Sequence, residues 1–300
     1  MNTHPSEALF SGEKLIPIIP SCEHFAGSEK LILKALQLQD SIGQIFDITC
    51  DCEDGAAAGQ EEEHAKMIVK ILNSEVNKYG MAGARIHDYT HASWKKDVEI
   101  LVQGLGNKLS YITIPKSTNA KQVKEMISYI QQIAQLHQIK REIPIHVLIE
   151  THGALEEINE IVKLPWIQVL DFGLMDFVSG HHGAIPADAM DRGQFDHPLI
   201  ARAMLEISAA CHAHGKVASH NVCTNIHDHS IIESDTLRAK NEFGYTRKWS
   251  IHPNQIPIIV QTLSPSAHEL EIAGAILLAA QEANWGPIQF EGKLHDRASY

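Results

Sequence analysis

The feature that most constrains the fold of this chain is a repeated alternation of short apolar segments with segments of helical periodicity. Runs such as IHVLIE (145–150) and VLDFGLMDF (169–177) are largely apolar, as is typical of parallel strands that are covered on both faces. Between them GALEEINEIV has helical spacing, so the three segments predict a strand–helix–strand unit. Eight strand–helix units in succession predict an α/β protein with the architecture of a (β/α)8 TIM barrel.

The eight expected strands each have a short apolar core and a helical pattern after it. They are KLIPIIP (14–20), IFDITCDCEDG (45–55), ARIHD (84–88), YITIPKS (111–117), IPIHVLIE (143–150), VLDFGLMDF (169–177), GKVASHN (215–221) and KWSIHPNQ (248–255). An open doubly wound sheet usually has fewer units and a glycine-rich first turn, and the chain contains neither GxGxxG nor GxxxxGK[ST]. We expect the barrel to span residues 1–263, with 1–13 as a loose tail. Residues 264–300 should add a C-terminal helix and a lid segment rather than an independent domain.

The composition excludes several classes of partner. There are 25 basic residues against 37 acidic ones, a formal charge of −12, whereas nucleic-acid and anionic-membrane surfaces need clustered Lys and Arg. The start of the chain has no apolar leader, and its longest late apolar run is far short of the roughly 20 residues that span a bilayer. The five cysteines form no CxxC pair, which favours reduced thiols. We therefore predict a cytoplasmic protein without nucleic-acid or membrane partners.

Two carboxylates mark the candidate site. Glu150 and Asp176 are expected at the carboxyl ends of neighbouring parallel strands, where they would face one pocket. Two acids so placed repel each other unless a cation or a proton lies between them. Carboxylates that leave other positions to water and substrate oxygens suit Mg²⁺ or Mn²⁺. The 19 histidines raise zinc as an alternative, but no HExxH motif is present and the first expected strand has no HxH pair.

Other polar residues are expected at the same edge of the barrel, and each has a structural reading as a helix cap, turn residue or ion-pair partner. These residues are Glu53, Asp54, Arg85, Lys116, His220, Asn221 and His252. Catalytic groups of a TIM barrel come from the carboxyl ends of several strands, so the set as a whole predicts an active site.

With these strands in place, the chain resembles the HpcH/HpaI aldolase/citrate lyase family, and most closely its branch of citrate lyase beta chains and malyl-CoA or citramalyl-CoA lyases. The resemblance runs from about Leu15 to Arg297. The matching segments, in family order, are DITCDCEDG, ARIHD, TIPKS, IETHGAL, FGLMDF and SIHPNQ.

The resemblance implies a chemistry and a set of roles. Family members cleave a 3-hydroxy acid, usually as its CoA thioester, to a keto acid and an acyl product. By this resemblance Glu150 and Asp176 hold Mg²⁺ and Arg85 stabilises the oxygen of the carbonyl that forms. Glu53 and Asp54 order the groups around the metal. Asp296, in GKLHD, corresponds loosely to an acid that protonates the departing enolate from an adjacent subunit, in a trimer or a dimer of trimers.

The chain also departs from the family pattern. It has Lys14 in place of an arginine, Pro20-Ser21 in place of Pro-Gly, and His87 in place of the asparagine that follows the Arg-Ile pair. The first two positions belong to the region that helps to hold CoA. The predicted substrate is therefore a hydroxy acid, either free or as a thioester.

Three functions follow as hypotheses. The first is a Mg²⁺-dependent carbon–carbon lyase that yields a keto acid. The second is a metal-assisted thioester hydrolase, which would yield none. The third is a metabolite-binding subunit that needs partner chains for turnover.

Overall fold

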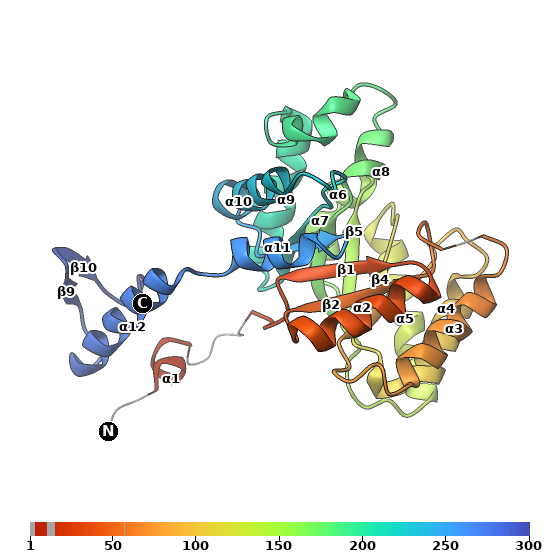
Figure 1. Ribbon diagram of the computed structural model, residues 1–300, viewed down its shortest axis with the longest axis horizontal. Coiled ribbons are helices and arrows are strands. Elements are labelled where there is room, and N and C mark those ends of the chain that lie inside the picture. Colours follow the sequence, from red (N-terminus) through yellow and green to blue (C-terminus); the bar gives the residue numbers. More distant parts are fainter. Residues whose placement is uncertain (1–3, 11–15, 57) are drawn as a thin grey trace. The chain divides into compact units, whose positions relative to one another are not determined.

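The computed structural model describes residues 4–10, 16–56 and 58–300, which fall into two compact units (Figure 1). One unit is Pro17–Leu263, and the other combines the N-terminal segment up to Ile16 with Ser264–Tyr300. Within the described residues, no helix has the length and apolarity that crossing a membrane requires.

The larger unit is a closed barrel of eight parallel strands in sequence order, which confirms the predicted (β/α)8 fold. The barrel closes where β1 pairs with β8. The strands are β1 (Cys22–Ala26), β2 (Phe46–Asp51), β3 (Ala82–Arg85), β4 (Ile112–Ile114), β5 (Ile145–Ile149), β6 (Ile167–Phe172), β7 (Val217–His220) and β8 (Arg247–Ser250).

Helices follow the strands and cover the outside of the barrel (Figure 1). They are α2 (Glu29–Ile42), α3 (Glu61–Asn73), α4 (Trp94–Leu105), η1 (Gly106–Lys108), α5 (Ala120–Leu136), α6 (His152–Glu156), α7 (Ile158–Ile161), α8 (Leu174–Ser179), η2 (Ala187–Met190), η3 (Arg192–Phe195), α9 (Pro198–Ala213), α10 (His229–Phe243) and α11 (Gln255–Leu263). Asn119 caps α5, because its side chain accepts a hydrogen bond from the Gln122 amide. Apolar faces such as that of α2, with Ile32 and Leu36, join the buried core.

The first predicted strand is wrong. Lys14 and Leu15 lie outside the described residues, the described part of KLIPIIP is not a strand, and Ile18 is 96% exposed. The strand that closes the barrel is CEHFA, which begins at Cys22. It carries Glu23 and His24 in its middle, so it lacks the apolar run by which buried strands are recognised. Glu23 is nevertheless fully buried, because Arg247 binds it inside the barrel.

The smaller unit contains α1 (Pro5–Phe10), α12 (Ala267–Glu282) and an antiparallel hairpin of β9 (Ile288–Phe290) and β10 (Lys293–His295). Ser266 begins α12 with a capping box, since its side chain and that of Glu269 each bond to the other's backbone amide. Arg297 donates a hydrogen bond to the Leu9 carbonyl, which ties the two ends of the chain together.

Candidate active site

Glu150 and Asp176 line the same cavity, as their placement in the sequence predicts. Glu150 directly follows β5 and is 3% exposed. Asp176 does not end the sixth strand, as expected, because β6 stops at Phe172 and Asp176 lies in the first turn of α8. A carboxylate in a first helical turn is favoured by the positive end of the helix dipole. The structure therefore brings the two acids to one pocket from a strand end and a helix start.

The electrostatics of this pair fit a cation. Burial, and then the charge of Asp176, raise the pKa of Glu150 to about 8. One Glu150 oxygen is fixed, because the Lys116 backbone amide donates to Oε1 at 2.6 Å. The cavity beside the pair has a volume of about 600 Å³, which leaves room for water and substrate oxygens. Two carboxylates with open positions are a donor set that suits Mg²⁺.

Gly173 keeps space for the Glu150 carboxyl group. A Cβ atom at Gly173 would lie 2.3 Å from Glu150 Oε2 and 2.4 Å from Glu150 Cβ, far inside van der Waals contact. This close approach explains why a glycine stands between β6 and α8.

Gly173→Ala is therefore expected to displace Glu150 and weaken Mg²⁺ binding by about 10- to 100-fold, the range found when groups that support metal ligands are removed. Isothermal titration calorimetry with Mg²⁺ measures this. Gly274→Ala is the matched control, since a Cβ atom there would meet nothing within 4 Å. Equal affinity in the two variants would contradict the proposed position of the Glu150 carboxylate.

Arg85, the last residue of β3, is held by two acids. Its Nε donates to Asp51 Oδ1 at 2.7 Å and its Nη2 to Asp51 Oδ2 at 2.5 Å, while Nη1 lies 3.1 Å from Glu53 Oε2. Burial opposes the charge on Asp51, but the Arg85 guanidinium lowers the pKa of that carboxyl below its usual value. Asp51 is not among the site residues predicted from the sequence. The alternation of Asp47, Thr49 and Asp51 along β2 is the signal that points them all into the barrel.

Ion pairs join the loops that follow β2 and β4, and they are formed by Lys116, Glu53 and Asp54. The Lys116 ammonium group lies 2.6 Å from Glu53 Oε1 and 2.7 Å from Asp54 Oδ2. Lys116 has a positive φ of 47°, which is uncommon for a residue other than glycine and is found mainly at constrained sites. Its side chain therefore binds Glu53 and Asp54 while its backbone amide binds Glu150.

The polar residues predicted at the ends of β7 and β8 differ in whether they line the cavity; they are His220, Asn221 and His252. Asn221 lines the cavity and donates to Gln194 Oε1 at 3.0 Å. His220 is fully buried away from the cavity lining, where its Nδ1 accepts a hydrogen bond from Lys248 Nζ at 2.9 Å. His252 lies after β8, accepts a hydrogen bond from the Asn254 amide, and is not among the described residues that line the cavity.

Aromatic and aliphatic side chains form the apolar half of the cavity. Phe25 stacks on Trp249 at 4.6 Å between ring centroids, and Arg85 lies over the Phe25 ring at 5.3 Å. The further apolar lining residues are Leu31, Phe172, Leu174, Met175, Val222 and Ile251. Phe25 was not predicted as a site residue because it belongs to β1, the strand whose position was predicted incorrectly.

His87 forms a buried pair with Asp97 beside this site. Its Nδ1 donates to Asp97 Oδ2 at 2.6 Å, and its backbone amide donates to the same oxygen at 3.0 Å. Burial disfavours the imidazolium, but the hydrogen bond and charge of Asp97 outweigh it and raise the pKa of His87.

A raised pKa means that folding favours protonated His87. The resulting stabilisation is complete below the unfolded-state pKa near 6.5 and is lost as the pH rises through the higher folded-state pKa. His87→Gln is therefore expected to cost more stability at pH 6 than at pH 9, as measured by urea unfolding. In an Asp97→Asn background this pH dependence should disappear, and its persistence there would exclude Asp97 as the cause.

Asp296 is exposed and belongs to the smaller unit, where its backbone amide donates a hydrogen bond to Ser299 Oγ. Its predicted function as an acid supplied by an adjacent subunit stays a prediction.

Comparison with known proteins identifies relatives over most of the chain. Residues 37–253 match the HpcH/HpaI aldolase/citrate lyase family. A malyl-CoA/beta-methylmalyl-CoA/citramalyl-CoA lyase from Chloroflexus aurantiacus is 30% identical over 228 residues, which cover 68% of this chain and 63% of that protein. The match thus spans less than two thirds of that relative. An L-malyl-CoA/beta-methylmalyl-CoA lyase from Rhodobacter capsulatus is 25% identical and covers 84% of this chain and 83% of its own.

Solved structures agree with this result. A citrate lyase from Burkholderia xenovorans LB400 is 50% identical, with a TM-score of 0.90 over 99% of this chain and 91% of the other. A citrate lyase beta subunit from Mycobacterium tuberculosis, complexed with oxaloacetate and magnesium, has a TM-score of 0.64 at 19% identity and covers 82% of this chain and 98% of its own. The latter likeness shows a shared fold.

Proposed function

Because this chain belongs to the HpcH/HpaI aldolase/citrate lyase family, we propose that it is a Mg²⁺-dependent carbon–carbon lyase. Its substrate is a 3-hydroxy acid or the CoA thioester of one, and its products are a keto acid and an acyl compound. The observation that carries this proposal is the convergence of Glu150, Asp176 and Arg85 on one cavity.

Each of these residues has a distinct task. Glu150 and Asp176 would hold the ion, with Glu150 Oε1 fixed by the Lys116 amide. An ion held there would supply Lewis-acid chemistry, which lowers the pKa of a substrate hydroxyl and polarises the carbonyl that forms. Arg85, locked by Asp51, presents a fixed positive charge to that carbonyl oxygen without having to reorganise during the reaction. Phe25 and Trp249 exclude water from the departing enolate.

The cavity supports a thioester substrate over a small free acid. Its volume of about 600 Å³ lies in the range of pockets that enclose ligands of drug size, well above the needs of a short keto acid. The lining combines the carboxylates and Arg85 with aromatic and aliphatic side chains. The polar groups suit the hydroxy-acid portion and the apolar groups suit an acyl chain. The malyl-CoA and citramalyl-CoA lyases named among the relatives act on molecules of this kind.

Product analysis tests the proposal. The purified protein is incubated with malyl-CoA or citramalyl-CoA and Mg²⁺, and the products are identified by mass spectrometry. A lyase yields glyoxylate or pyruvate together with an acyl-CoA. Release of free CoA with an intact hydroxy acid would instead identify a thioester hydrolase. Turnover only after addition of partner chains would identify a subunit that needs them.

We further propose that Asp296 protonates the enolate in a homo-oligomer, as a trimer or a dimer of trimers. Its exposure is compatible with that role, since an acid supplied to another subunit must reach the surface. Asp296→Asn should lower kcat by about 10²- to 10⁴-fold, the usual worth of a general acid. Mg²⁺ affinity should not change. An unaltered kcat would remove Asp296 from the mechanism.

A further inference from the structure

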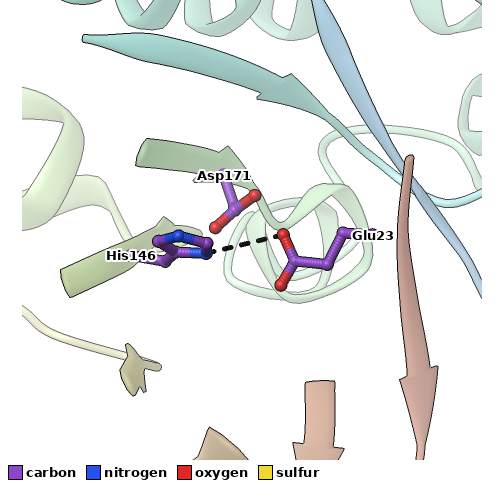
Figure 2. Close-up of side chains that lie close together, drawn as sticks. All are labelled: Glu23, His146 and Asp171. Carbon is purple, nitrogen blue, oxygen red and sulfur yellow. Dashed lines mark ion pairs between the residues drawn. The ribbon is translucent and has the colours of Figure 1, made fainter. Parts of the chain in front are cut away.

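A second group of potential metal ligands lies inside the barrel. Glu23 of β1, His146 of β5 and Asp171 of β6 point toward one another from three strands (Figure 2), and all three are fully buried. His146 precedes Glu150 on the same chain segment by four residues. At about 3.3 Å per residue, the two Cα atoms are about 13 Å apart along the strand. This group is therefore separate from the Glu150–Asp176 pair.

The geometry leaves space for an ion. One ligand atom from each residue can be chosen so that all three atoms lie within 4.8 Å of one another, and His146 Nδ1 is 3.6 Å from Glu23 Oε2. For three such atoms there is always a point that lies within about 2.8 Å of each of them. Shifts of a few tenths of an ångström would bring the ligands to the roughly 2.0–2.3 Å typical of transition-metal bonds.

The hydrogen bonding of His146 also favours a bound metal ion. Its Nε2 is paired with Gln168 Oε1 at 3.2 Å, and since a carbonyl oxygen only accepts, Nε2 carries the proton. In the neutral imidazole, which is the form that binds a metal, Nδ1 then presents a lone pair to two carboxylates. His146 Nδ1 and Asp171 Oδ2 are both buried and have no hydrogen-bond partner among the described residues. Lone pairs converging without a cation or a proton repel, so the arrangement calls for a positive charge at its centre.

The remaining atoms of the group are already fixed. Trp249 Nε1 donates to Asp171 Oδ1 at 2.8 Å, and Thr49 Oγ1 donates to Glu23 Oε1 at 2.5 Å. The His146 ring stacks on Tyr111 at 4.0 Å between centroids. Hydrogen bonds of this type orient the ligands in metal sites. Two inward-facing atoms, His146 Nδ1 and Asp171 Oδ2, keep no hydrogen-bond partner among the described residues, whereas Glu23 Oε2 also accepts from Arg247.

The charges in contact with the group do not balance. Arg247 contributes one positive charge, with Nη2 at 2.8 Å from Glu23 Oε2 and 2.7 Å from Asp47 Oδ1. Glu23, Asp47 and Asp171 contribute three negative charges when ionised. With a neutral His146 the group carries a formal charge of −2, which one divalent cation neutralises.

We propose that Glu23, His146 and Asp171 form a second metal site, for a divalent first-row transition ion such as Zn²⁺ or Mn²⁺. The imidazole ligand selects against Mg²⁺, which prefers oxygen ligands alone. The site joins β1 to β5 and β6 across the barrel core, so it serves stability rather than turnover. Because all three ligands are buried, the ion enters as the chain folds.

Metal analysis after refolding tests this inference without measuring activity. The Asp176→Asn variant, whose Mg²⁺ pair is disabled, is unfolded in EDTA, refolded with Zn²⁺ or Mn²⁺, desalted, and analysed by plasma mass spectrometry. We expect about one equivalent of the ion per chain, and a higher Tm than after refolding in EDTA, because metal that binds only the folded state stabilises it. The same variant with His146→Gln should retain less than about a tenth of an equivalent. His137→Gln, at an exposed position, is the matched control and should retain the ion.

Two results would overturn the inference. Under a tenth of an equivalent in the Asp176→Asn variant with both ions would mean that protons neutralise the group. Equal metal content with and without His146 would place the ion elsewhere. If the His146→Gln variant does not refold, Glu23→Gln is tested in its place. The first of the two results does not depend on either substitution, because it is measured on the Asp176→Asn variant, which keeps both His146 and Glu23.

Discussion

Glu150→Gln and Asp176→Asn are each expected to abolish Mg²⁺ binding and to lower kcat by about 10³-fold or more. Metal coordination contributes several kcal/mol of transition-state stabilisation, and about 4 kcal/mol corresponds to a factor of 10³. Both substitutions keep the size of the side chain and remove its charge. Steady-state kinetics with saturating thioester, together with calorimetric titration of Mg²⁺, measure the two effects.

The fold should survive these substitutions. Since burial and Asp176 raise the pKa of Glu150 to about 8, the metal-free protein holds this carboxyl against a repulsive environment. Removing either charge relieves that repulsion, so the thermal stability of both metal-free variants should equal or exceed that of the parent chain. Retained Mg²⁺ binding and turnover in either variant would reject the assignment of these residues as ligands.

Asp51→Asn is expected to have the second-largest effect. It removes the bidentate partner of a buried guanidinium and leaves Arg85 with Glu53 as its nearest acid. Breaking a buried ion pair by removing one partner typically costs about 3–5 kcal/mol of stability. Misplacing Arg85 should also lower kcat by about 10²-fold or more, as removal of a preorganised donor does. Urea unfolding and kinetics measure the two losses.

Asp54→Asn is the matched control for Asp51→Asn. Its carboxylate pairs with Lys116 but its side chain is 56% exposed, and exposed ion pairs contribute less than about 1 kcal/mol. Stability losses of similar size in the two variants would show that the Arg85–Asp51 pair does not organise the site.

The barrel was predictable because strands such as β4, β5 and β6 carry the pattern that burial imposes. Parallel strands covered on both faces are usually apolar, so segments such as the one before Glu150 could be placed from the sequence. The first strand could not be placed in this way. Glu23 is buried only because Arg247, more than 200 residues later in the chain, neutralises it. No local pattern records a partner that distant.

The site was also predictable only in part. Glu150 and Arg85 stand at or directly after strand ends, so the topology of a TIM barrel brings them together. Asp176 was found for a partly wrong reason, since it begins a helix rather than ends a strand. His220 also follows the strand pattern, but its side chain faces Lys248 and the Phe195 ring rather than the cavity. Alternation along a strand assigns a face only when the register is known to the residue.

Residues that support the site were harder to foresee than residues within it. Gly173 matters through the atom it lacks, and Lys116 through a backbone amide as well as a side chain. Asp97 lies ten residues from the His87 it holds, on a helix whose pattern marks the position only as inward-facing. Such roles depend on distances of a few ångströms between separate elements, which the sequence does not encode locally.

The most direct test of the central claim is the anomalous scattering of Mn²⁺ in crystals grown with Mn²⁺ and a keto acid such as pyruvate. We predict an anomalous peak bonded to Glu150 and Asp176, with the keto acid on the ion and within hydrogen-bonding reach of Arg85. A crystal with the keto acid bound but no peak between these two carboxylates would contradict the proposed metal-dependent lyase.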